Sequence, residues 1–186
     1  MSNKLFVIGG GINGAGIARD AALRGIDVTL FEQNDFCSGT SWASSKLIHG
    51  GLRYLEHFEL RLVRESLKER EILLRNYPQN VHGLRFLIPV YKHSQHHLTT
   101  IRTGMAIYDR LAFDTSLPHH ESWTAQEIEK NVPGLRKEAL QGGITYYDGQ
   151  CPFPERLVLA NLHSAVEAGA KVFNYHRVEK LLKNEN

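Results

Sequence analysis

The sequence is poor in cysteine and contains no long apolar run. Its two cysteines, Cys37 and Cys151, lie too far apart for a CxxC pair or a metal knuckle, and two thiols cannot build a disulfide framework. No stretch approaches the roughly 18 consecutive apolar residues that span a bilayer. The apolar run at residues 5–8 is too short for a signal peptide. We therefore expect a cytoplasmic protein that meets a membrane only peripherally.

The sequence also lacks an excess of charge of either sign. Lys and Arg number 22 against 20 Asp and Glu, so the formal net charge of +2 predicts no nucleic-acid binding. Hydrophobic residues at 42% and charged residues at 23% are ordinary values for a globular protein. A chain of 186 residues can form one domain, or one domain and an incomplete second.

The beginning of the chain has the pattern of a βαβ unit. Residues 5–8 form an apolar run bounded by glycine, which is typical of a strand buried on both faces. Small and apolar residues then recur at helical spacing over residues 12–23, and residues 28–31 predict a second strand. The expected fold class is therefore α/β, with a Rossmann-like parallel sheet.

The rest of the chain predicts a region of mixed elements and then a return to the first pattern. The predicted helices and strands are a long amphipathic helix at 58–77, a strand at 84–91, a helix at 101–111, a short helix capped at 124–127, a strand at 142–147, a helix at 155–168 and a strand at 171–178.

This pattern divides the chain into three segments. We expect a first part of the nucleotide-binding domain at residues 1–78, an inserted partial α+β cap or substrate region at 79–150, and a return to the first domain at 151–186. A doubly wound sheet normally continues past its third strand, so we expect the chain to be an incomplete form of a longer protein.

Three glycines after the first predicted strand form a dinucleotide-binding motif. Gly9, Gly11 and Gly14 make GxGxxG at the start of a helix, where unpaired N–H groups and a partial positive charge can receive a pyrophosphate. Glu32 follows the second predicted strand, where a carboxylate can accept hydrogen bonds from ribose hydroxyls. The alternative is a glycine-rich turn in an α/β protein without a nucleotide, with Glu32 merely solvated.

Two segments resemble a known family. Residues 7–16, and residues 40–56 nearly residue for residue, are similar to segments of the FAD-dependent glycerol-3-phosphate dehydrogenases, although Cys37 and Trp42 stand where that family usually has small residues. Residues 148–157 resemble a turn and helix of the wider superfamily of FAD-dependent amine and hydroxy-acid oxidases. The resemblance implies an FAD-binding domain, and it covers only the leading part of the family's sequence.

The resemblance implies a set of FAD-contacting residues. Serine hydroxyls and a lysine can reach flavin phosphates or the polar edge of the ring, and adjacent glycines let backbone lie flat against it. For His49 the alternative is a hydrogen bond within the core. The expected cofactor-binding residues are Gly9, Gly11, Gly14, Glu32, Thr40, Ser41, Ser44, Ser45, Lys46, His49, Gly50 and Gly51.

Arg53 and Tyr54 are the expected substrate contacts. A guanidinium can bind phosphate through two parallel N–H bonds, and a phenol can orient a neighbouring oxygen. The alternative for Arg53 is a surface salt bridge to Glu56 or Glu59. The resemblance names no general base.

The reaction that the resemblance implies is oxidation of sn-glycerol 3-phosphate to dihydroxyacetone phosphate, with hydride transfer to flavin and electrons passed to quinone or, in oxidase relatives, to oxygen. We expect this chain alone to bind FAD weakly or not at all and to lack turnover. Two alternatives stay open: another FAD-dependent amine or 2-hydroxy-acid oxidase, and a non-catalytic fragment that only binds nucleotide.

The histidines do not predict a metal site. His93, His96, His97, His119 and His120 lie in polar, loop-like sequence without Cys or carboxylate partners at ligand spacing. We expect no metal.

Overall fold

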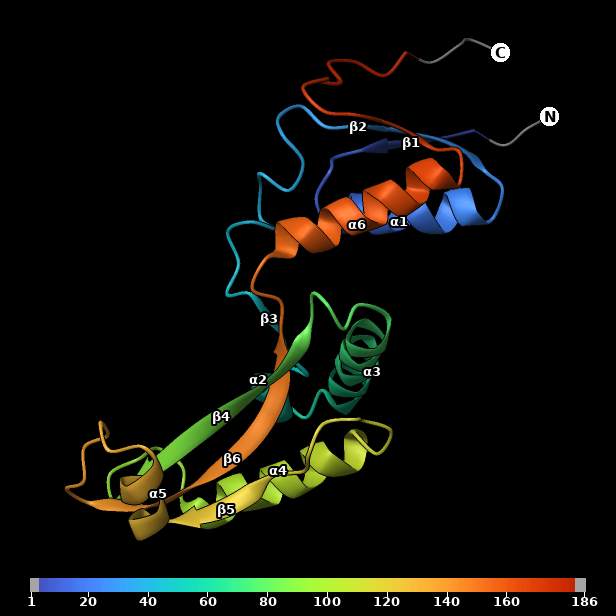
Figure 1. Cartoon of the computed structure of the whole chain (residues 1–186). Coiled ribbons are helices and arrows are strands. Elements are labelled where there is room, and N and C mark those ends of the chain that lie inside the picture. Colours follow the sequence, from blue (N-terminus) through green and yellow to red (C-terminus); the bar gives the residue numbers. More distant parts are fainter. Residues whose placement is uncertain (1–3, 183–186) are drawn as a thin grey trace. The chain divides into compact units, whose positions relative to one another are not determined.

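The structure, a computed structural model, describes residues 4–182 and forms two compact units (Figure 1). Unit 1 contains the chain up to Lys46 and from Cys151 on, whereas unit 2 is the continuous segment Leu47–Gln150. Each unit has its own buried apolar core. The expected α/β class, with a Rossmann-like parallel sheet and a second α+β region, is confirmed.

The boundary of the first unit differs from the expected one. The sequence pattern places it at residue 78, whereas the chain leaves unit 1 at Lys46. The difference arises because β3 (Leu47–Ile48) pairs antiparallel with β6 (Leu140–Gln150), and α3 (Leu60–Asn76) packs on α4 (Leu98–Leu111). These contacts join residues that are distant in sequence, which local periodicity does not report.

Unit 1 is built on a parallel sheet in the order β1 (Lys4–Ile8), β2 (Asp27–Phe31), β7 (Lys171–Phe173). Two helices, α1 (Ile12–Leu23) and α6 (Pro154–Glu167), lie side by side on one face of it (Figure 1). Small side chains let the two helices approach closely. The buried side chains of these helices include Ala15, Ala18, Ala22, Val158, Leu162 and Ala165. The predicted strand–helix–strand unit at the start of the chain is thus confirmed.

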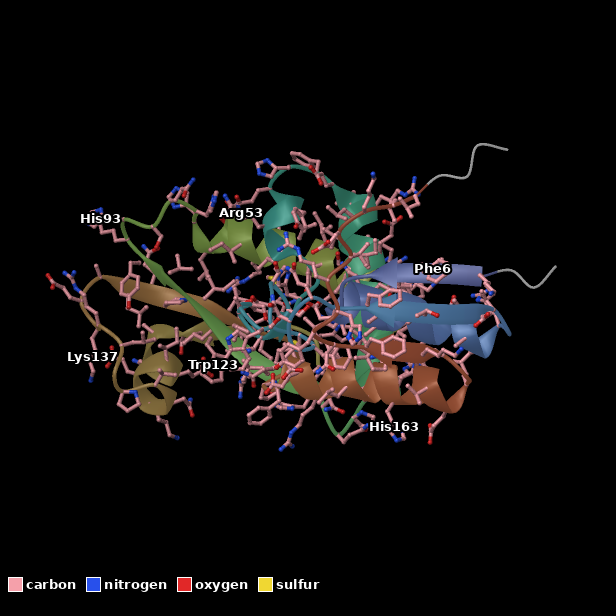
Figure 2. All side chains as sticks on the ribbon, turned by 90° about the horizontal axis from the view of Figure 1, so that it is seen from above. Phe6, Arg53, His93, Trp123, Lys137 and His163 are labelled. Atoms are coloured by element: carbon pink, nitrogen blue, oxygen red, sulfur yellow. The ribbon has the colours of Figure 1, made fainter. Side chains whose placement is uncertain are left out.

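The other face of this sheet carries aromatic side chains. Phe6, labelled in Figure 2, is 63% exposed, and Ile8 is 60% exposed. The ring of Phe31 stacks between those of Phe6 and Phe173, at centroid distances of 6.4 and 5.7 Å. The expectation that residues 5–8 are buried on both faces is wrong for the described part of the chain, because α1 and α6 cover the same face.

The last predicted strand is shorter than expected. The pattern predicts residues 171–178, whereas β7 ends at Phe173. Beyond it the backbone bonds to the loop after β2. The Tyr175 N–H donates to the Asn34 carbonyl oxygen at 2.9 Å, and the His176 N–H donates to that of Glu32 at 2.8 Å.

Unit 2 is an antiparallel sheet with helices packed against it. Strand β6 is central and pairs with β3, with β4 (His82–Tyr91) and with β5 (Glu121–Thr124). Helix α5 (Ala125–Asn131) follows β5 and begins with the predicted capping box between Thr124 and Glu127, which is confirmed. The core side chains from α3, α4 and β6 are Val63, Leu67, Met105, Tyr108 and Ile144.

The predicted helix at 58–77 is preceded by a separate short helix. Helix α2 (Leu52–Leu55) ends before Phe58, whose φ of 56° takes the backbone into the left-handed region, and α3 then begins at Leu60. Phe58 is 85% exposed, so no burial of its ring accompanies this turn. Among residues 4–182, no helix is both long and apolar enough to cross a membrane.

The ion pair between Arg64 of α3 and Asp114 makes stability depend on pH. Two parallel bonds, Nη1 to Oδ1 at 2.7 Å and Nη2 to Oδ2 at 2.8 Å, lower the pKa of Asp114 from 3.8 to about 2. Because the pKa of Asp114 is lower in the folded protein than in the unfolded chain, the ionised carboxylate stabilises the fold above about pH 4. This contribution is lost as the pH falls from about 4 to about 2. We expect the Asp114 carboxyl signal to titrate near 2 by NMR. In Arg64→Met it should titrate near 4 instead, and a value near 4 in the unaltered protein would refute the interpretation.

Candidate functional site

The turn between β1 and α1 depends on glycine at two positions. Gly9 has a φ of 108°, and its N–H donates to the Phe31 carbonyl oxygen at 2.8 Å, which ties the turn to β2. A Cβ on Gly14 would overlap the carbonyl oxygen of Gly9. Gly11 is the N-cap of α1 and has extended backbone that any residue can adopt. A side chain there is disfavoured by the nearby Ser41 Oγ and not by backbone strain. The start of the helix therefore lies directly against the end of the strand.

Glu32 is a structural part of this turn. Its Oε2 accepts the Gly10 N–H at 2.7 Å, and its Oε1 accepts the Asn34 N–H at 2.8 Å. The side chain is half-buried, so it is not the merely solvated glutamate of the alternative interpretation. Each carboxylate oxygen has two lone pairs, so both keep acceptor capacity for a further donor such as a hydroxyl.

The loop after β2 brings one predicted residue to the helix terminus. Ser41 Oγ accepts the Ile12 N–H at 2.9 Å, so this hydroxyl lies where α1 begins. Lys46 instead donates from Nζ to the Trp42 carbonyl oxygen at 2.8 Å and lies over the Trp42 ring, 4.3 Å from its centroid. Thr40, Ser44 and Ser45 are exposed on the same loop.

These features of unit 1 fit the diphosphate of a dinucleotide. The positive φ of Gly9 disfavours a side chain there, the backbone at Gly14 leaves no space for one, and the first N–H groups of a helix have no helical partners. A carboxylate stands at the end of the neighbouring strand, where a ribose hydroxyl can donate to it.

The remaining predicted residues belong to unit 2, around a cavity of about 630 Å³. Its wall is formed by the segment that carries β3 and α2 and by residues of β4 and β6. The lining residues are Leu47, His49, Gly51, Leu52, Arg53, Tyr54, His57, Glu59, Phe86, Tyr146 and Asp148. Sequence reasoning missed His57, Glu59 and Asp148, although His57 follows the resembling segment directly.

Helix α2 presents Arg53 and Tyr54 at this cavity. Arg53 is labelled in Figure 2, and both side chains are exposed. Within residues 4–182, Arg53 makes no ion pair with Glu56 or Glu59; Glu56 instead lies 3.4 Å from His96 Nε2. The guanidinium is therefore available to an anion in the cavity, which the surface salt-bridge alternative would prevent.

The cavity lining also includes two groups that can form hydrogen bonds with a ligand, the His49 ring and the Tyr146 hydroxyl. The Gly51 N–H donates to His49 Nδ1 at 3.2 Å, so the neutral His49 ring carries its proton on Nε2. Burial, and then the charge of Asp148, raise the pKa of Tyr146 to about 12, which keeps its hydroxyl protonated. Gly51 has a φ of 73° and is the N-cap of α2.

Gly50 is required by packing inside unit 2. Its N–H donates to Asp148 Oδ1 at 3.1 Å, and a Cβ on it would overlap the Tyr108 hydroxyl and the Leu67 side chain. From the sequence, the absence of a side chain here is expected to make room for a flavin ring. The structure gives an additional reason, and the contact with flavin stays a prediction.

The other titratable groups form no metal or thiol centre among residues 4–182. No three His, Cys, Asp or Glu side chains of this part of the chain are grouped to hold a metal ion. His120 Nδ1 lies 2.7 Å from Asp109 Oδ2, and His119 Nδ1 lies 3.3 Å from the same oxygen. Both cysteines are buried, and burial raises the pKa of each thiol, so neither is an activated nucleophile.

The order of strand, glycine turn, helix and strand, with an acidic residue closing the second strand, defines a dinucleotide-binding α/β protein. Comparison with known proteins is more specific. The model of the FAD dependent oxidoreductase family matches residues 4–186, and the chain belongs to this family.

Similar curated proteins share high identity with the whole chain. The glycerol-3-phosphate dehydrogenase of Synechocystis sp. is 51% identical over 182 residues, which are 98% of this chain and 33% of that protein. The aerobic glycerol-3-phosphate dehydrogenase of Escherichia coli is 45% identical over 95% of this chain and 34% of its own. The D-erythritol 1-phosphate dehydrogenase of Brucella abortus is 44% identical over 90% of this chain and 33% of its own. The chain thus spans about one third of the length of these relatives.

Two solved structures share this fold at different levels of sequence identity. The glycerol-3-phosphate dehydrogenase of Bacillus halodurans, complexed with FAD, is 32% identical with a TM-score of 0.71, over 100% of this chain and 28% of that one. The L-proline dehydrogenase of P. horikoshii has a TM-score of 0.76 at 24% identity. The match covers 99% of this chain and 46% of that one. At that identity the second match shows the fold alone.

Substitutions at two glycines of α1, Gly14 and Gly16, distinguish the effect of close packing from the effect of helix propensity. Gly14→Ala places a Cβ on the Gly9 carbonyl oxygen, so we expect a loss of about 1–3 kcal/mol in the free energy of unfolding. Gly16 has open space at its Cβ position, so Gly16→Ala should raise stability by roughly 0.5–1 kcal/mol. Urea denaturation of both variants measures the two signs. Equal effects of the same sign would contradict the close approach of helix and strand.

Proposed function

We propose that the protein to which this chain belongs oxidises sn-glycerol 3-phosphate to dihydroxyacetone phosphate with FAD as its cofactor. The observation that carries the substrate assignment is the cavity of unit 2, where Arg53 and Tyr54 stand side by side on α2 and no acidic side chain of the described chain pairs with Arg53. Family membership supports FAD, and the names of the similar dehydrogenases support a polyol phosphate.

In this proposal unit 1 holds the adenine-dinucleotide part of the cofactor. The α1 terminus receives the diphosphate at Gly9, Gly11 and Gly14, and Glu32 accepts from the ribose hydroxyls while it keeps its two backbone partners. Ser41 adds a hydroxyl at the helix start. The other proposed contacts are Thr40, Ser44, Ser45 and Lys46 in unit 1, and His49, Gly50 and Gly51 in unit 2. Bound FAD supplies an acceptor for the hydride of the substrate.

The cavity residues bind and orient the substrate. Arg53 can grip the phosphate through two parallel N–H bonds, and Tyr54 can orient a neighbouring oxygen. The C2 hydroxyl must lose a proton as the carbonyl forms, and His57 and Glu59 are cavity side chains able to take one. We propose quinone as the electron acceptor, which agrees with a peripheral encounter with a membrane.

A second candidate substrate is a longer polyol phosphate. The similar D-erythritol 1-phosphate dehydrogenase is 44% identical over 169 residues, and the phosphate-binding role of Arg53 is the same for both substrates. A guanidinium binds carboxylates as well as phosphates, so Arg53 would equally serve the substrate carboxylate of an amino-acid or 2-hydroxy-acid oxidase. A panel of these substrates therefore tests the class of reaction.

Arg53→Ala should selectively impair phosphorylated substrates. Loss of a hydrogen-bonded charge costs about 1.5–3 kcal/mol, so kcat/KM for sn-glycerol 3-phosphate should fall roughly 10- to 150-fold. Activity toward unphosphorylated glycerol should not change. Dye-linked oxidation by the FAD-loaded protein measures both, with Arg61→Ala as the control because Arg61 only pairs with Glu65 on the surface of α3. An unchanged kcat/KM in Arg53→Ala would exclude the proposed phosphate contact.

Glu32→Ala should weaken nucleotide binding. The variant removes an acceptor of ribose hydroxyls and frees the Gly10 N–H, so the dissociation constant for FAD should rise roughly 10- to 150-fold. Flavin fluorescence quenching measures it, and ADP serves as a probe without the flavin. Asp27→Ala, an exposed carboxylate at the other end of β2, is the control and should bind both unchanged. If Glu32→Ala also binds them unchanged, Glu32 serves the turn alone.

A further inference from the structure

An ionic network lies buried beneath the cavity wall of unit 2. Arg70 of α3 and Asp148 of β6 are 1% and 2% exposed, and Arg70 Nη1 lies 2.6 Å from Asp148 Oδ1. Burying such a pair is expensive in desolvation, and apolar side chains of similar volume are often as stable or more so. Stability alone is therefore a weak reason for this pair.

The network holds the Asp148 carboxylate in one place. The Tyr108 hydroxyl of α4 donates to Asp148 Oδ1 at 3.2 Å and accepts from Arg70 Nη1 at 3.3 Å. Arg70 Nη2 donates to Thr115 Oγ1 at 3.1 Å, which fixes the guanidinium from its other side. Burial, and then the charge of Asp148, raise the pKa of the Tyr108 hydroxyl, so it stays a donor. Side chains from two helices, α3 and α4, thus converge on one carboxylate of β6.

The same carboxylate oxygen reaches the cavity wall. Oδ1 accepts the Gly50 N–H at 3.1 Å, and Asp148 itself lines the cavity. The next N–H, that of Gly51, donates to His49 Nδ1 at 3.2 Å, and Gly51 then begins the helix that carries Arg53. The core of unit 2 and the ligand-facing segment are therefore joined at the Gly50 amide.

We propose that Asp148, fixed by Arg70 and Tyr108, is a positioning residue that sets the His49–Gly50–Gly51 segment, and through it His49 and Arg53, at the cavity. The consequence for catalysis rests on the proposed function, whereas the fixing of the segment does not. A merely structural role predicts that loss of the Asp148 acceptor lowers stability alone. A positioning role predicts faster opening at Gly50 and weaker anion binding in a protein that is still folded.

The test compares two side chains at position 148 in a protein that lacks both the Arg70 guanidinium and the Tyr108 hydroxyl. Arg70→Met and Tyr108→Phe remove the partners that would otherwise be left unpaired. In this background, Asp148→Asn keeps an oxygen that can accept the Gly50 N–H, and Asp148→Leu has a similar shape but no acceptor. Urea denaturation first establishes that both variants of the 186-residue chain fold. Amide hydrogen exchange at Gly50 and Gly51, and binding of inorganic phosphate followed by NMR, are then measured.

We expect exchange at Gly50 to be about tenfold faster in the Leu variant than in the Asn variant, and phosphate to bind about tenfold more weakly. In the FAD-loaded protein the Leu variant should lose kcat about tenfold relative to the Asn variant. Equal exchange and equal phosphate binding in the two variants would overturn the proposal. If the unaltered protein does not oxidise sn-glycerol 3-phosphate, the proposed function fails, and the exchange difference still decides the role of Asp148.

Discussion

In both candidate binding regions of this chain, the backbone at a glycine lies so close to a neighbouring group that there is no space for a side chain. In unit 1 the start of α1 lies on the Gly9 carbonyl oxygen, so the helix dipole is brought to the end of β1 only because Gly14 has no Cβ. In unit 2 the Gly50 backbone lies against the Tyr108 hydroxyl and the Leu67 side chain. In each case the neighbouring carboxylate, Glu32 or Asp148, accepts an N–H of the same glycine segment.

Both carboxylates accept a glycine N–H, but they differ in burial. Glu32 is half-buried and, within residues 4–182, its carboxylate accepts only backbone N–H groups, so its remaining acceptor capacity is available at the surface of unit 1. Asp148 is 2% exposed, and without a counter-charge its burial would be costly. Arg70 supplies that counter-charge at 2.6 Å. The difference in burial explains why one carboxylate stands without a cation and the other requires one.

Local sequence patterns predicted the first strand, glycine turn, helix and second strand of unit 1 well because these elements are consecutive in the sequence. The turn, α1 and β2 lie within about thirty consecutive residues, and each step has its own signal: a glycine, a helical repeat or an apolar run. Unit 2 depends on contacts between distant residues. The Gly50–Asp148 bond spans 98 positions, and the β3–β6 pairing that moves the domain boundary spans a similar distance. Helical periodicity marks α3 as amphipathic, but it cannot reveal that Arg70, one of several arginines on that helix, is the buried one.

The fold by itself does not select the substrate. A proline dehydrogenase and a glycerol-3-phosphate dehydrogenase both match this chain along nearly its whole length, with TM-scores of 0.76 and 0.71. Substrate selection must therefore come from side chains, because the two enzymes share the fold. Arg53, the phosphate contact proposed above, projects from a helix only four residues long, Leu52–Leu55, whose start is set by Gly51. A helix that short has little stability of its own, so its position depends on the packing of Leu52 and Leu55 against the core of unit 2 and on the residues that precede it. The hydrogen bond from the Gly50 amide to a charge-balanced Asp148 is the contact in unit 2 best placed to impose it.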